Sequence, residues 1–174
     1  MKREDFYWDD RHSEPKPGNS SEAIENMERR LNISFPASLR EGYCFADNAS
    51  IFKNGKRCED VISGPKTAGG NWMGSFSYLE GLGRIPHETR YLQDWVEDVF
   101  ERGLPDVFPF ATLGGGGWTC LNYQNDPTRA NPEIWQFDQN GTSFDDCFTK
   151  VADNFDHLIE MLVSEDDLVR LGFG

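Results

Sequence analysis

A run of four glycines, Gly114–Gly117, invites comparison with a phosphate-binding loop. A Walker loop ends in Gly-Lys-Ser/Thr and opens a helix, so that the lysine and the helix N-terminus meet the phosphates. Here Trp118 and Thr119 follow the glycines, and the alternation of apolar and polar residues from Trp118 to Tyr123 indicates a strand instead. The dinucleotide fingerprint also requires a helix after its glycines. We therefore interpret the run as a turn or bulge between packed elements.

Residue types that serve in acid–base and nucleophilic catalysis are present but scattered. His12, His87 and His157 are widely separated, and neither a Gly-x-Ser-x-Gly elbow nor an HExxH motif occurs. Adjacent acids such as Asp9–Asp10 and Asp145–Asp146 would point to opposite faces of a strand, so we expect no carboxylate dyad at that spacing. The sequence favours a protein that is not an enzyme and has no catalytic residues.

The cysteines also lack the spacing of a metal site. Cys44, Cys58, Cys120 and Cys147 form no CxxC pair, and no Cys/His ligand spacing appears. Cys120 and Cys147 lie among apolar residues and are expected to be small core residues with free thiols. We expect neither a metal nor a cofactor.

The charge balance points to a class of partner. Thirty acidic residues against 17 basic residues give a formal net charge of -13. This balance argues against direct nucleic-acid binding, which needs clusters of Lys and Arg, and it suits a basic protein partner, although acidity also serves solubility alone. No apolar run is long enough to cross a bilayer, and Met1–Asp5 lacks the apolar run of a signal peptide, so we expect a cytoplasmic protein that does not bind membranes.

Apolar periodicity predicts the order helix, helix, weak strands, helix, three strands, helix. The helices are expected over about 22–31, 37–45, 86–102 and 153–163, and the strands over 49–52, 72–79, 118–123, 133–138 and 146–151. Asn19 and Asp153 are expected to cap the first and last of these helices, with a short acidic tail after residue 163. In the strand that follows the glycines, Trp118, Cys120 and Asn122 should face one side, and Thr119, Leu121 and Tyr123 the other.

The helix that begins at Pro86 carries the clearest pattern. Its apolar stripe consists of Leu92, Trp95, Val96, Val99 and Phe100, and Gly103 is the expected C-cap. The outer face carries Glu97, Asp98 and Glu101, which oppose the helix dipole because they lie near its C-terminus. This cost marks a possible binding site, and a simple solvated face is the alternative reading.

These elements predict an α+β fold, with an antiparallel or mixed sheet and helices packed on one face or end. Residues 1–20 are expected to form a flexible or loosely docked arm that packs back onto the body or contacts a partner. Residues 21–174 are expected to form one domain.

Several stretches, in order and spacing, resemble the SUKH superfamily, which includes the Smi/Knr regulators of yeast and many bacterial immunity proteins. They are residues 23–31, 33–36 with the helix that follows, 107–111 with the glycines, 119–123, 132–135 and 151–158, and together they span roughly 22–162. The chain departs from the family pattern at Asp47–Ser50, where the family usually has Asn-Gly-Gly, at Asn122, where it often has an acid, and in a longer region over 51–83.

The resemblance implies an α+β fold without catalysis and, in bacteria, an immunity protein that neutralises a cognate polymorphic or contact-dependent toxin. A nuclease toxin, which carries a basic cleft, would suit an acidic inhibitor. Because buried aromatic residues usually dominate binding energy, the candidate partner-binding residues are Trp72, Trp118, Asp145 and Asp146, with the Glu97, Asp98 and Glu101 face. The alternatives are a regulatory scaffold for an endogenous partner and, less favoured, an enzyme or small-molecule binder.

Overall fold

The computed structural model describes residues 6–9, 18–47, 49–53, 56–58, 60–63, 71–76, 78–113 and 117–173. Within these ranges the chain forms helices and antiparallel strands, which confirms the expected α+β class. The helices are α1 (Ser21–Leu31), α2 (Ala37–Phe45), the short 3-10 helix η2 (Leu82–Arg84), α3 (Ile85–Phe100), α4 (Phe144–Cys147), α5 (Phe155–Met161) and α6 (Glu165–Arg170).

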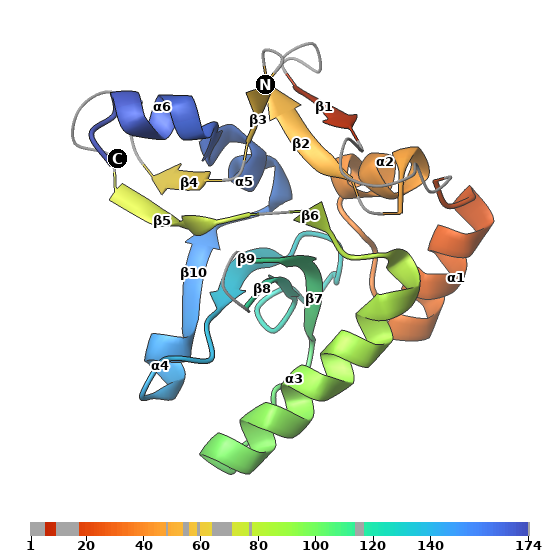
Figure 1. Ribbon diagram of the computed structural model, residues 1–174. Coiled ribbons are helices and arrows are strands. Elements are labelled where there is room, and N and C mark those ends of the chain that lie inside the picture. Colours follow the sequence, from red (N-terminus) through yellow and green to blue (C-terminus); the bar gives the residue numbers. More distant parts are fainter. Residues whose placement is uncertain are drawn as a thin grey trace.

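The strands of the described residues form three sheets (Figure 1). The central sheet has the order β10–β9–β8–β7–β6, with β6 (Tyr78–Leu79), β7 (Val107–Thr112), β8 (Trp118–Asn122), β9 (Glu133–Phe137) and β10 (Phe148–Ala152). The second sheet is β1 (Phe6–Asp9), β2 (Ser50–Lys53) and β3 (Lys56–Arg57), and the third joins β11 (Leu162–Val163), β4 (Asp60–Ser63) and β5 (Asn71–Ser75).

Strand β8 lies in the middle of the central sheet and is covered on both faces. Leu121 and Tyr123 belong to the larger hydrophobic cluster, which also contains side chains of α1, α2 and α5. Trp118 and Cys120 belong to the second cluster, together with side chains of α3. The expected alternation along this strand is confirmed, and the structure adds that helices pack on both faces of the sheet.

Strand β7 is one of the elements that periodicity missed. Residues 107–111 are apolar throughout, so they show no alternation, and they contain Pro109, which cannot donate a ladder hydrogen bond. The structure accommodates the proline beside a register shift between Pro109 and Ala111 in the pairing with β8. Such irregularities are where a sheet tolerates proline.

The connection from β7 to β8 shows why a glycine is needed at one of its ends. Residues 114–116 lie outside the described part of the chain, but Gly117 is described, and the Leu113 N–H donates to its carbonyl oxygen at 3.0 Å. A Cβ on Gly117 would lie 2.1 Å from the carbonyl oxygen of Phe137. Residue 117 is therefore a glycine because the backbone of β9 leaves no room for a side chain.

Helices α1 and α2 form a corner held by the carboxylate of Glu28. The N-cap of α1 is Ser20, whose hydroxyl accepts from the Ala23 N–H, rather than the expected Asn19. Glu28 is buried, and its carboxylate accepts from the Phe35 N–H at 2.7 Å and from Arg40 at 3.0 Å. Leu39 and Tyr43 of α2 and its C-cap Ala46 are buried.

The C-terminal region is more helical than expected. Residues 144–147 form α4 rather than the start of a strand, and residues 165–170 form α6 rather than a tail. The hydroxyls of Ser143 and Ser164 accept from the third amide of each helix, and acids in the first turn complement the helix dipole. Asn154, rather than Asp153, caps α5 in the same way.

The single strand expected over 72–79 is wrong, because the chain divides it between two sheets. β5 pairs with β4, whereas β6 pairs with β7 in the central sheet. Phe76 lies between the two strands and is fully buried. Gly74, within β5, adopts a φ of 138°, where side-chain-bearing residues are strained. The turn into the core at Phe76 ends the first strand.

Replacing Glu28 with alanine should destabilise the fold by roughly 2–3 kcal/mol, because the buried Phe35 N–H then has no acceptor. Glu28→Gln keeps an acceptor oxygen at the same place and should cost less. Urea unfolding of both variants measures the difference. Equal losses in the two variants would show that the hydrogen bond to Phe35 does not hold the corner.

Candidate partner-binding surface

A row of directly paired residues crosses the central sheet from edge to edge. It consists of Tyr78, Thr112, Trp118, Phe137 and Phe148, one from each strand. Directly paired residues of antiparallel strands share a face of the sheet, so these side chains lie side by side. The Trp118 and Phe137 rings stack with centroids 5.6 Å apart, and the Phe137 and Phe148 centroids are 4.9 Å apart. We call these five residues the aromatic row.

Helix α3 lies along the aromatic row. Tyr91 contacts Trp118 at a ring-centroid distance of 5.6 Å, and Trp95 contacts Phe137 at 4.9 Å. At the far end Phe100 contacts Phe144 of α4 at 5.7 Å. Leu92 and Val96 fill the space between helix and sheet. The apolar stripe read from the sequence is therefore confirmed for its central residues, but Val99 is 51% exposed and does not face the core.

One end of the aromatic row reaches the surface. Tyr78 is 39% exposed and Tyr91 is 50% exposed, while Trp118, which contacts Tyr91, is half-buried. Towards the other end of the row, Phe137 and Phe148 are buried. Ring contacts thus lead from Phe148 and Phe137 in the core through Trp118 to Tyr91 at the surface. We define Tyr78, Tyr91 and Trp118 as the exposed aromatic patch.

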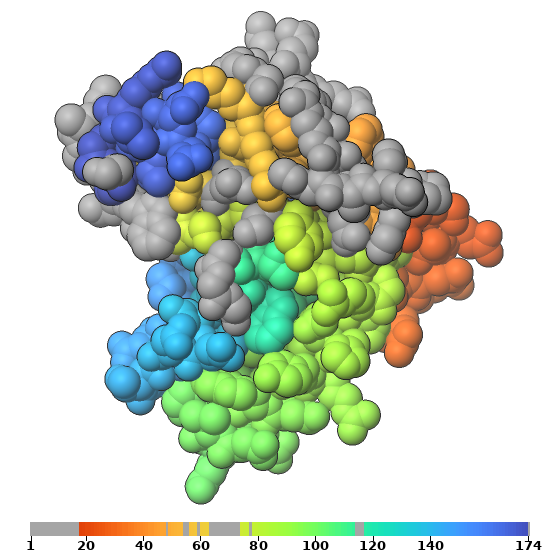
Figure 2. Space-filling model, in the orientation of Figure 1, coloured from red at the N-terminus to blue at the C-terminus, as the bar shows by residue number. Residues whose placement is uncertain are grey.

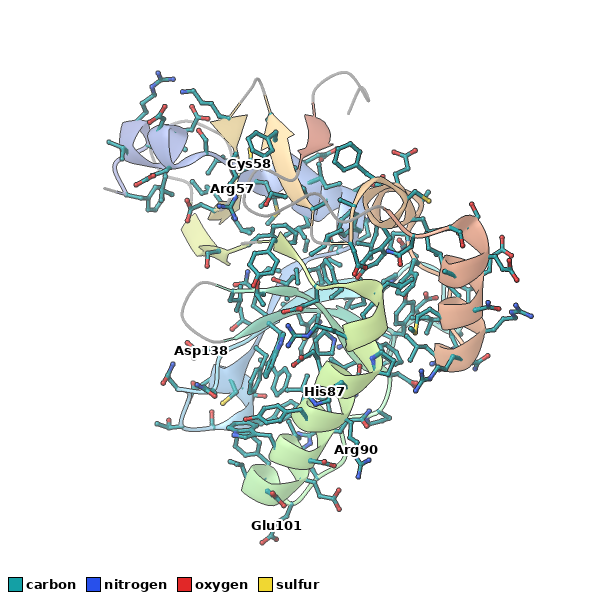
Figure 3. The ribbon with its side chains drawn as sticks, turned by 45° about the vertical axis from the view of Figure 1, so that its right-hand side comes forward. Arg57, Cys58, His87, Arg90, Glu101 and Asp138 are labelled. Atoms are coloured by element: carbon teal, nitrogen blue, oxygen red, sulfur yellow. The ribbon has the colours of Figure 1, made fainter. Side chains whose placement is uncertain are left out.

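The acids of α3 and α4 gather at one end of the molecule. Glu97, Asp98, Glu101 and Asp145 are exposed, and none of them forms an ion pair within the part of the chain that the structure describes. Figure 2 shows the C-terminal half of α3 and the α4 region meeting at the lower end of the molecule. In Figure 3, Glu101 marks the free end of α3, with His87 and Arg90 nearer its start. We call these four residues, with Asp146, the acidic end.

Positive charge near the acidic end is sparse and mostly engaged. The Arg102 guanidinium lies 3.9 Å from the centre of the Phe144 ring, in a cation–π contact. Arg90 pairs with Asp94 at 3.6 Å between two exposed side chains. Hydrogen bonds from Ser143 and Thr142 hold the pKa of Asp146 below its usual value, so its charge persists to lower pH. The acidic end therefore presents a net negative surface.

Most of the candidate partner-binding residues predicted from the sequence lie on two helices and one strand that contact one another. Contacts between α3 and α4 place Asp145 and Asp146 at the same end as Glu97, Asp98 and Glu101, and Tyr91 links Trp118 to the same helix. Trp72 lies apart from them in β5, where it pairs with Ile62 in a different sheet, and its side chain is outside the described structure.

Sequence reasoning missed Tyr78 and Tyr91. Tyr91 lies one helical turn before Trp95, so its place beside the apolar stripe could have been read from the spacing. Tyr78 carried no such signal, because its place in the aromatic row depends on the pairing of β6 with β7.

Two buried carboxylates secure the start of α3. The exposed guanidinium of Arg84 lies 3.3 Å from Glu80 and 2.5 Å from Glu88, and both glutamates are buried. Burial raises the pKa of Glu80, the Arg84 charge lowers it, and the Glu88 charge adds to the rise, with a net shift upward. His87 is exposed and lies 3.5 Å from the Glu88 carboxylate. These ion pairs fix the start of α3, the helix that carries Tyr91 and most of the acidic end.

The hollows of the molecule lie elsewhere. An open groove of about 610 Å³ runs between α1 and the loop around Arg129, and a pocket of about 420 Å³ lies under α6 beside Lys53 and Lys56. Among the described residues, no group of three or more His, Cys, Asp or Glu side chains could hold a metal ion. No helix within those residues is both long and apolar enough to span a membrane.

Glu80→Gln should change the pH dependence of stability in a defined direction. The folded-state pKa of Glu80 lies above the ordinary value of 4.5, so its stabilising contribution is present below that value and is lost as pH rises through the folded pKa. The free energy of unfolding of the wild type relative to the variant should therefore fall as pH rises from about 4.5. Urea titrations at a series of pH values, with the exposed Glu22→Gln as control, check this; a flat difference would contradict it.

Glu97→Lys and Glu101→Lys should each stabilise the isolated protein by roughly 0.3–1 kcal/mol at low ionic strength. Both residues lie at the C-terminal end of α3, whose last turn contains no basic residue, so a positive charge there complements the helix dipole. Thermal and urea unfolding at low and high salt measure the gain, which should shrink as salt screens it. Loss of stability in both variants would show that these acids support the fold.

A sequence model of the SMI1 / KNR4 family (SUKH-1) matches residues 18–161, from the residues before α1 to the end of α5. A comparison with curated proteins gives no significant match. Proteins of this family are known for immunity and binding roles rather than for catalysis. Since the match covers well over half of the 174 residues, the chain belongs to the SMI1 / KNR4 family (SUKH-1), and at the family level this suggests an immunity-protein-like role.

Proposed function

We propose that this chain is a cytoplasmic immunity protein that neutralises a cognate polymorphic or contact-dependent toxin by stoichiometric binding. Family membership supports the general role. The observation that carries the finer proposal is the surplus of exposed carboxylates without ion pairs at the acidic end. Such a surface attracts a basic protein and repels nucleic acid.

The charge also suggests how binding would inhibit. A protein with a formal net charge of -13 associates rapidly with a positively charged cleft, because long-range attraction steers the encounter. Nucleases carry such clefts, since they bind phosphates. An acidic protein seated in the cleft would exclude the substrate without any chemical step, so inhibition would follow the molar ratio of the two proteins.

A regulatory scaffold that binds an endogenous protein is the second candidate, because an acidic end with a neighbouring aromatic patch would serve such a partner equally well. The two roles differ in what binding achieves. An immunity protein abolishes the activity of its partner, whereas a scaffold leaves the partner active and brings it to another molecule. Inhibition measured against molar ratio separates them.

Co-expression with the toxin domain encoded beside its gene should restore growth, and the purified proteins should form a one-to-one complex. Light scattering after gel filtration gives the stoichiometry, and toxin activity titrated with the protein should reach zero near equimolar ratio. A toxin domain from an unrelated system is the control and should stay active. Binding that leaves the cognate toxin active would support the scaffold role, and absence of binding would reject the immunity role.

A further inference from the structure

The placement of acids on α3 works against the stability of the helix. Asp94, Glu97, Asp98 and Glu101 occupy its C-terminal half, where the helix dipole favours cations, and no basic residue lies in its last turn. Glu97, Asp98 and Glu101 form no ion pair within the described ranges. Folding alone does not account for this arrangement, because lysine at these positions would stabilise the same helix.

Apolar surface accompanies these charges on the same helix. Tyr91 is half exposed towards the start of α3, and Val99 is exposed between Asp98 and Phe100 near its end. Tyr91 contacts Trp118, which stacks on Phe137, so the exposed aromatic patch is held in place by the core. Rings that are already ordered lose little conformational freedom when a partner covers them, so they are suited to be binding anchors.

We propose that the exposed face of α3 is the docking surface for the toxin, with Tyr91 and Trp118 as the anchor and Glu97, Asp98 and Glu101 as the region that steers a basic surface into place. This inference rests on the proposed immunity function and adds to it the location of the interface and a division of labour along it. The acidic end sets the association rate, and the aromatic patch sets the dissociation rate.

The charge of the face selects its occupant. Nucleic acid would be repelled by the unpaired carboxylates. A second copy of the chain would bring the same formal net charge of -13 to the same place, so self-association through this face is opposed. A protein with a basic surface is attracted to this face, which extends along a helix of 16 residues, or roughly 24 Å.

Two pairs of variants test the division of labour, with the catalytically inactivated toxin domain from the neighbouring gene as the probe. Glu97→Lys/Glu101→Lys is matched with Glu22→Lys/Glu165→Lys, which makes the same change in net charge at exposed acids of α1 and α6. Tyr91→Ala is matched with Phe45→Ala, which removes an equally exposed aromatic ring from α2. Stopped-flow association and surface plasmon resonance measure the rates at low and physiological salt.

The α3 charge reversal should lower the association rate constant about tenfold or more at low salt, with little change in dissociation, and its matched control should change it far less. Tyr91→Ala should raise the dissociation rate constant about tenfold or more, whereas Phe45→Ala should leave it near the wild-type value. Because the charge reversal should also stabilise the free protein, slower association cannot be attributed to damaged folding.

The outcomes separate the inference from the function on which it rests. A wild-type protein that binds the toxin domain while both α3 variants behave like their controls would overturn the docking surface and leave the immunity function standing. A wild-type protein that does not bind would overturn both. Equal losses from the α3 reversal and its matched control would mean that net charge, and not this face, governs association, which also overturns the inference.

Discussion

The packing of α3 against the aromatic row is the interaction on which the rest of the structure depends. Rings from β8, β9 and β10 contact one another, and rings from α3 and α4 close over them. Edge-to-face and offset contacts at these centroid distances add to the free energy that burial alone supplies. These ring contacts hold the central sheet, α3 and α4 together. The positions of the charged groups at the acidic end, which lie on α3 and α4, follow from that packing.

The same packing explains how a chain with only 37% hydrophobic residues forms a core and also has an exposed aromatic patch. Aromatic residues supply more buried area per side chain than aliphatic ones, so few positions are needed. Where the rings reach the surface, Tyr91 keeps its contact with Trp118 and is half exposed. One set of side chains therefore supplies both the core packing and the exposed aromatic rings, whereas the acids at the end of α3 oppose the dipole of that helix.

The sequence was most informative where periodicity was strong. The alternation of β8 and the stripe of α3 apart from Val99 follow from spacing alone. It failed where a contact distant in sequence decides the outcome. Pro109 lies in a strand because a register shift accommodates it, and residues 72–79 divide because Phe76 enters the core. Caps were misplaced by one residue at Ser20 and Asn154, since neighbouring polar residues compete for the role.

For the candidate surface, the acids of α3 could be predicted from composition and helical spacing. Their proximity to the acids of α4 could not be predicted. That proximity depends on the contact between Phe100 and Phe144, which lies 44 positions later in the chain. Tyr78 entered the surface only through strand pairing. Half-buried Trp118, in the same row, has a further consequence. An indole at the boundary between protein and water changes its fluorescence emission when the water is displaced, so the molecule carries an intrinsic optical reporter at the place where the aromatic row emerges.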